Sequence, residues 1–213
     1  MFQPKHVANA RHRKAKPMSD FYNKTLLMVR RLLPYVLLFL IAQFAIRLTL
    51  AIYSHASLTT VADWLLPFAT GFLFDVSVVL MALPVLLVFP TLVPKSWAGG
   101  RLDRSVAFGA FAILAFLMIF QGISEYFFWD EFTTRFNFIA VDYLIYTQEV
   151  LANILESYPV VPLLAFAAAA SLAVAWFSRN QLFGGLDQMP RLGGRLAVFA
   201  LFCALSAGAY AVT

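Results

Sequence analysis

Acidic side chains, the groups that bind divalent metals or act in acid–base catalysis, gather in one part of this chain. Six of the eleven acidic residues lie between Glu125 and Pro159. Glu125, Asp130 and Glu131 are close enough in sequence to suggest a metal or acid–base cluster, yet no histidine or cysteine joins them. Acidic residues are also common in a loop on the outer side of a membrane. We therefore interpret these three carboxylates as part of a polar surface segment, with a metal or acid–base cluster as the lesser alternative.

Two further charged residues, Arg47 and Asp75, lie inside long apolar stretches. A charge in the hydrocarbon of a bilayer costs a few kcal/mol or more unless it is paired or hydrated. At a rise of about 1.5 Å per residue, the two positions differ in depth by roughly 6 Å, within reach of an arginine side chain. We expect a structural ion pair between them. The alternatives are an Arg47 that extends to the outer surface while Asp75 is protonated or bonded to Ser77 or Thr70, and a role in handling protons or substrate.

Other catalytic signatures are missing from the sequence. It contains no glycine-rich phosphate loop, no HExxH and no GxSxG motif. The three histidines are scattered, and the single cysteine, Cys203, lies in an apolar run. We therefore expect no catalytic residue and no metal ligand in this chain.

The elements that position these residues are membrane spans. Hydrophobic residues make up 62% of the 213 residues and charged residues only 13%, which is typical of an integral membrane protein. About 20 apolar residues are needed to cross a bilayer as a helix. We predict an all-α, five-helix bundle, with residues 1–31 as a basic tail and 32–213 as a transmembrane domain. The predicted spans are about 32–53, 65–93, 106–123, 160–177 and 196–212.

The distribution of basic residues predicts the orientation. Fourteen of the sixteen Lys and Arg residues fall before the first span, between the second and third, or between the fourth and fifth. In the remaining two connections Arg135 is the only one. By the positive-inside rule, we expect a cytoplasmic N-terminus and a C-terminus on the opposite face. The basic tail is interpreted as a topology signal attracted to anionic lipid headgroups rather than as a nucleic-acid-binding arm.

The segment of about 125–158 is then predicted to form helices at the outer membrane surface. Asp142, Glu149, Asn153 and Glu156 are spaced seven, four and three residues apart, so they share one face of a helix that Pro159 ends. Leucine, isoleucine and tyrosine occupy the opposite face, and the aromatic residues upstream suit headgroup depth. We expect this amphipathic helix to lie flat on the membrane.

The same segment resembles a known family. It contains Phe128-Trp129-Asp130-Glu131-Phe132, then the run from Arg135 through Asn137 to Asp142-Tyr143-Leu144, and then Glu149-Val150, Asn153-Ile154 and Glu156-Ser157-Tyr158-Pro159. These motifs are similar to those of the lipoteichoic acid synthase-like phosphoglycerol transferases, often labelled the sulfatase family, in their Gram-negative form. The motif covers about 35 residues, and the resemblance extends over nearly the whole chain. It marks Trp129, Asp130, Glu131, Arg135, Asn137, Asp142, Tyr143, Glu149 and Tyr158 as residues of a periplasmic surface element.

The resemblance implies a function for which this chain supplies only part. In that family, five spans precede an alkaline-phosphatase-like domain with a threonine nucleophile and bound manganese or magnesium. That domain would begin after Thr213, so no catalytic or metal residue can be assigned here. The implied role is an inner-membrane module that anchors the enzyme and faces a lipid donor, with phosphatidylglycerol as the expected lipid. The alkaline-phosphatase-like domain is the expected partner, in cis or in trans, and nucleic acid is not. The alternatives are a stand-alone membrane protein that binds or transports a small solute or lipid, and a structural subunit of an envelope complex.

Overall fold

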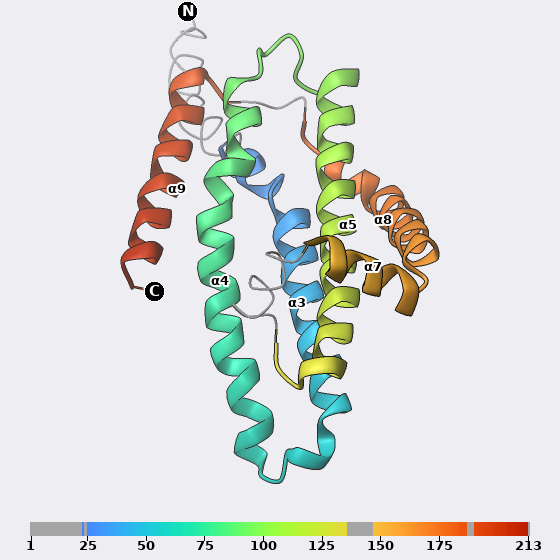
Figure 1. Cartoon of the computed structure of the whole chain (residues 1–213). Helices are drawn as coiled ribbons and strands as arrows, with labels where there is room; N and C mark the ends of the chain where they lie inside the picture. Colours follow the sequence, from blue (N-terminus) through green and yellow to red (C-terminus); the bar gives the residue numbers. More distant parts are fainter. Residues whose placement is uncertain (1–22, 24, 136–146, 187–189, 213) are drawn as a thin grey trace, which may run out of the picture. The chain divides into compact units, whose positions relative to one another are not determined.

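The computed structural model describes residues 23, 25–135, 147–186 and 190–212, and 86% of these are helical, with no strand among them. The elements, shown in Figure 1, are α3 (Leu33–Tyr53), the 3-10 turn η1 (His55–Ser57), α4 (Val61–Leu92), α5 (Arg101–Phe132), α7 (Thr147–Ser157), α8 (Val160–Phe183) and α9 (Leu192–Val212). Five helical segments, the first of them Thr25–Tyr53, are long and apolar enough to cross a membrane. The predicted all-α class with five spans is confirmed, and the chain is a multi-pass membrane protein.

The third span differs most from the prediction. The expected span ends at Ile123, whereas α5 continues without interruption to Phe132. No glycine or proline interrupts the sequence between Ile123 and Phe132, so the backbone stays helical although the side chains change from apolar to acidic and aromatic. The residues from Glu125 to Phe132 therefore belong to α5 and do not form a separate surface helix. The helix ends where Thr133 adopts a left-handed conformation with φ of 51°.

The predicted amphipathic helix begins near Val141, and its first part lies outside the described residues. The described part is α7, from Thr147 to Ser157. It stops just before Pro159, as expected from a residue that cannot donate a backbone hydrogen bond.

The second span begins earlier than expected, at Val61 instead of near Leu65, because a capping box precedes it. The backbone N–H of Asp63 donates to Thr60 Oγ1 at 3.2 Å, and the Asp63 carboxylate accepts from the Thr60 N–H at 2.8 Å. This reciprocal pair satisfies two backbone donors that the first turn of a helix leaves open.

The described residues divide into two compact units. Of the described residues, unit 1 contains those up to Pro34, from Ser77 to Val106 and from Gln181 on, and unit 2 contains those from Tyr35 to Val76 and from Ala107 to Asn180. Unit 2 thus contains most of α3, α5 and α8, the first half of α4, and α7. Unit 1 contains α9 and the second half of α4.

In unit 1, Arg195 of α9 completes the C-terminal end of α4. Its Nη1 donates to the carbonyl oxygens of Pro90 at 3.3 Å and Val93 at 2.6 Å. The Pro90 carbonyl would normally accept from residue 94, but Pro94 has no N–H. Arg195, which is 4% exposed, supplies the missing donor and places a cation at the negative end of the helix dipole.

A buried ion pair also lies in unit 1. Arg31 Nη2 lies 2.7 Å from Asp103 Oδ1, and both side chains are almost fully buried. The second Asp103 oxygen accepts from the Gly99 N–H at 2.9 Å, just before α5 begins. The carboxylate therefore caps α5 and neutralises Arg31 at the same time.

Candidate functional site

Helix α3 carries the polar side chains around which unit 2 is built. Gln43 and Arg47 are four residues apart, so they lie on one face of the helix, and both are buried. Each bonds to a different neighbouring helix. Gln43 donates to Gln121 of α5 at 3.2 Å, and Arg47 Nη2 lies 2.9 Å from Asp75 Oδ2 of α4.

The predicted ion pair between Arg47 and Asp75 is present in the structure. Arg47 is 8% exposed, so its guanidinium does not extend to the surface. Thr70, considered as a partner of Asp75, donates instead to the Leu66 carbonyl within its own helix at 2.7 Å. Because both charges are buried and paired, the arrangement clamps α3 to α4.

Gly71 of α4 makes room for this ion pair, a feature that we did not predict. A Cβ atom at position 71 would lie 2.4 Å from Cζ and Nε of Arg47, far inside van der Waals contact. The guanidinium therefore lies directly over the backbone of α4. The spacing of Gly71 and Asp75, one helical turn apart, was the sequence signal that could have revealed it.

A second charged pair lies at the end of α5. Glu125 is 2% exposed and pairs with Arg135, which is about half exposed. Glu125 follows Gln121 by one helical turn, so α5 presents a half-buried and a buried polar side chain on one face. Glu125 was expected in a surface segment, and the structure corrects this: it is a buried carboxylate whose partner comes from beyond the helix end.

Aromatic residues and Asp130 surround this end of unit 2. The Tyr53 hydroxyl of α3 donates to Asp130, and its ring packs edge to face on Tyr126 at 5.8 Å. The Phe127 ring lies 4.3 Å from the ring of Tyr158, which directly follows α7. The ends of α3 and α5 and the α7–α8 connection are therefore tied together, and we call this region the aromatic-acidic end.

The remaining residues of the predicted periplasmic surface element are partly exposed and partly outside the described residues. Trp129 is half-buried, and Asp130 and Glu131 are exposed. Asn137, Asp142 and Tyr143 lie outside the described residues, and so does the side chain of Glu149, although its backbone belongs to α7. Among the described side chains, no group of three or more His, Cys, Asp or Glu residues is arranged to hold a metal ion.

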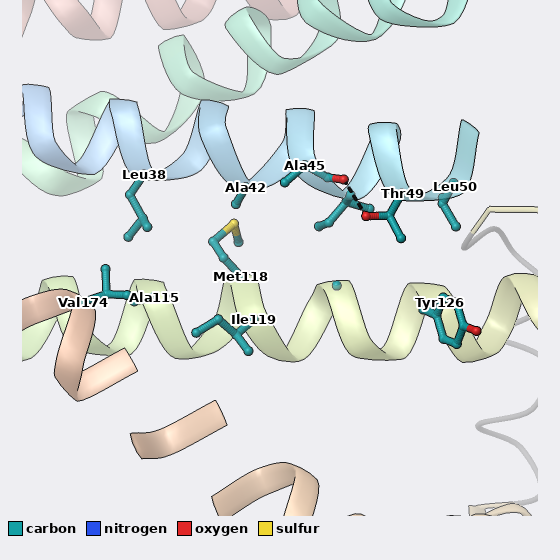
Figure 2. Close-up of a pocket in the computed structure, with 12 residues that line it drawn as sticks. Leu38, Ala42, Ala45, Thr49, Leu50, Ala115, Met118, Ile119, Tyr126 and Val174 are labelled. Atoms are coloured by element: carbon teal, nitrogen blue, oxygen red, sulfur yellow. Dashed lines mark hydrogen bonds between the residues drawn. The ribbon is translucent and has the colours of Figure 1, made fainter. Parts of the chain in front are cut away.

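An apolar groove lies between α3 and α5, with α8 contributing at one end (Figure 2). Its volume is about 290 Å³. Its lining residues are mostly aliphatic: Leu38, Ala42, Ala45, Ile46, Thr49, Leu50, Ala115, Met118, Ile119, Gly122, Tyr126 and Val174. A shallower hollow shares Thr49, Ile119, Gly122 and Tyr126 and extends the groove to Phe127 and to Leu163 of α8. The sequence gives no signal for this groove, because small residues on two separate helices create it.

No protein-family model, no curated protein and no solved structure matches this chain.

The ion pair predicts a non-additive effect of mutation. Arg47→Leu alone leaves the Asp75 carboxylate buried without its partner, and we expect a loss of about 3–5 kcal/mol of stability. Arg47→Leu combined with Asp75→Leu removes both charges and should lose less than the single change. Thermal unfolding of the detergent-solubilised variants, including Asp75→Leu alone, measures this. Losses that simply add would rule out the coupling.

The close approach of Arg47 to Gly71 gives a second prediction. Gly71→Ala should displace the guanidinium and lower stability by about 1–3 kcal/mol relative to a matched glycine change. Gly109→Ala in α5 is that control, because a Cβ there meets no atom within 4 Å. Both changes gain the same intrinsic helix propensity, so the difference between their unfolding temperatures isolates the clash. Equal stabilisation of both variants would contradict the packing described here.

Proposed function

We propose that this chain is the membrane domain of a phosphoglycerol transferase resembling the lipoteichoic acid synthases. In this role it anchors the enzyme and holds the lipid donor next to an alkaline-phosphatase-like catalytic domain, supplied in cis or in trans. The observation that carries the proposal is the segment from Glu125 to Pro159, whose motifs resemble that family. Manganese or magnesium belongs to the proposed partner domain.

The aromatic-acidic end supports this role because it is a built structure. Glu125 is anchored by Arg135, Asp130 by Tyr53, and Tyr158 by Phe127. These contacts hold the exposed Asp130 carboxylate and the half-buried rings of Phe127 and Tyr158 against α3, α5 and the α7–α8 connection. A rigid end of this kind suits docking of a partner domain better than a mobile loop does.

A membrane-held donor also has a kinetic advantage. A transferase that uses a lipid headgroup gains from being tethered at the bilayer, where the effective concentration of its substrate is high. The apolar groove next to Tyr126 supports a donor-facing surface in this unit.

The proposed location is the bacterial inner membrane, with the N-terminus in the cytoplasm and the C-terminus in the periplasm. The distribution of Lys and Arg supports this orientation. The aromatic-acidic end would then face the periplasm, as a donor-presenting surface requires.

The orientation predicts the activity of reporter fusions. An alkaline phosphatase reporter attached after Thr213 should be active, because that enzyme needs the oxidising periplasm to form its disulfides. The same reporter inserted at Gly100, between α4 and α5, should be inactive. A green fluorescent reporter at the two positions is the control and should give the opposite pattern. Periplasmic activity at Gly100 would reverse the proposed topology.

The proposed function is tested by reconstitution. Purified chain is inserted into phosphatidylglycerol vesicles, a soluble alkaline-phosphatase-like phosphoglycerol transferase domain is added, and glycerol phosphate release is measured. We expect at least about a tenfold gain over vesicles without the chain, since tethering typically raises effective concentration by this much or more. Phosphatidylcholine vesicles are the control for headgroup chemistry. No gain with either lipid would overturn the donor-positioning role.

One observation favours the alternative of a stand-alone lipid-binding protein. The groove between α3 and α5 is apolar, and the buried polar side chains Gln43 and Arg47 of α3 bond to α5 and α4 instead of lining it. If the chain binds lipid but does not increase glycerol phosphate release in the reconstitution, we would conclude that it is a stand-alone lipid-binding protein and not a transferase module.

A further inference from the structure

The groove between α3 and α5 has the chemistry of a hydrocarbon site. Its only side-chain hydroxyls are those of Thr49 and Tyr126, and Thr49 donates its own to the Ala45 carbonyl at 2.9 Å. The polar residues Gln43 and Arg47 of α3 are bonded to α5 and α4 instead. A water molecule needs two to four polar partners to be held in a protein cavity. The groove offers a water molecule too few polar partners, so apolar groups are expected to occupy it.

The groove has a defined length and direction. The hydrogen bonds between α3 and α5 join Tyr35 to Ala107, Gln43 to Gln121 and Tyr53 to Asp130, so residue numbers rise together along the two helices and they run parallel. Leu38 thus lies level with Ala115, and Thr49 with Tyr126, as Figure 2 shows. At about 1.5 Å per residue, the distance from Leu38 to Thr49 is about 17 Å.

The small cross-section of the groove limits the kind of group that can fill it. A transmembrane helix of the same length, about 10 Å across, fills more than about 1,000 Å³. The groove holds about 290 Å³, so it cannot enclose a partner helix or a helix of a second copy of this chain. At about 30 Å³ for a water-sized group, it accommodates about ten methylene-sized groups in a row. A single alkyl chain has these dimensions.

The two ends of the groove differ in polarity. Leu38, Ala115 and Val174 close one end with aliphatic groups. Thr49 and the 40% exposed Tyr126 form the other end, next to the aromatic-acidic end. Tyrosine side chains favour the depth at which lipid chains meet their headgroups. The polarity therefore orients an amphiphile with its ester end at Tyr126 and its methyl end at Leu38.

Gly122 of α5 keeps the middle of the groove open. A Cβ at this position would lie 3.4 Å from Cγ1 of Ile46, in ordinary van der Waals contact, so its absence leaves the space beside Ile46 open. Ala45 lies level with Gly122 on α3 and is exposed toward the groove. The small side chains at both positions leave the space that a lipid chain would take.

We propose that this groove binds one acyl chain of a membrane phospholipid and so positions the headgroup beside the aromatic-acidic end. This inference deepens the proposed function and rests on it for the identity of the lipid as the donor. Chain binding itself depends only on the shape and polarity of the groove.

Photolabelling of the full chain in vesicles tests the site. The probe is a phosphatidylglycerol whose acyl chain carries a diazirine either near the ester or near the methyl end, and the labelled residues are located by mass spectrometry. The ester-end probe should label residues near Thr49 and Tyr126, and the methyl-end probe should label residues near Leu38 and Ala115. A reversed pattern, or labelling spread evenly over the exposed faces of α4 and α8, would overturn the proposal.

Ala45→Phe supplies the blocked variant, because its ring would point into the groove and not into the core. Labelling of the groove should fall at least about tenfold, which corresponds to about 1.4 kcal/mol of lost binding. Ala169→Phe is the matched control, since Ala169 is an exposed residue of α8 that does not line the groove. It should retain labelling within about twofold. Unchanged labelling in the folded Ala45→Phe protein would refute the site, and thermal unfolding of both variants verifies the fold.

Two further comparisons separate this proposal from the proposed function. A phosphatidylcholine probe with the same chain that labels the groove equally well supports the acyl-chain site and argues against selection of a phosphoglycerol donor. A diazirine fatty acid that labels the groove where neither phospholipid does would overturn the phospholipid assignment. Groove labelling together with no gain of glycerol phosphate release would remove the transferase role and leave a lipid-binding protein.

Discussion

A polar group within the hydrocarbon of a membrane must find its partner inside the protein, and in unit 2 this constraint is met through α3. Gln43 and Arg47 lie one turn apart and reach two different helices. At the end of α3, Tyr53 bonds to Asp130 of α5. The polar face of α3 therefore fixes α4 and α5 in register. Because the polar side chains of α3 are bonded to α4 and α5, the residues of α3 that line the groove are almost all apolar. An apolar groove can therefore lie beside a buried ion pair.

Much of the membrane architecture could be predicted from the sequence, because a span is defined by composition over about 20 residues. The pairing of Arg47 with Asp75 could also be predicted, since an isolated charge in a span is costly and only one opposite charge lay within reach. Neither prediction needed tertiary information. Both rest on the bilayer acting as a uniform solvent.

The polar contacts that the sequence did not reveal depend on geometry. Gln43 and Gln121 are uncharged, so hydropathy gives no reason to pair them, and their contact follows only from the parallel register of α3 and α5. Glu125 looked like an exposed loop residue because acidic composition was taken as the end of the span, whereas α5 continues to Phe132. Gly71 looked unremarkable until the Arg47 guanidinium was placed against it. Composition locates spans well, but it does not show which face of a helix meets which neighbour.

The bond from Arg195 to the end of α4 has a consequence for biogenesis. The two carbonyls that it satisfies belong to Pro90 and Val93, more than a hundred positions earlier in the chain. Until α9 has been made, the Pro90 carbonyl therefore lacks the backbone donor that would lie one helical turn ahead, because Pro94 has no N–H. The donor arrives 105 residues later with Arg195, so the C-terminal end of α4 reaches its final hydrogen bonding only after α9 has been made and inserted.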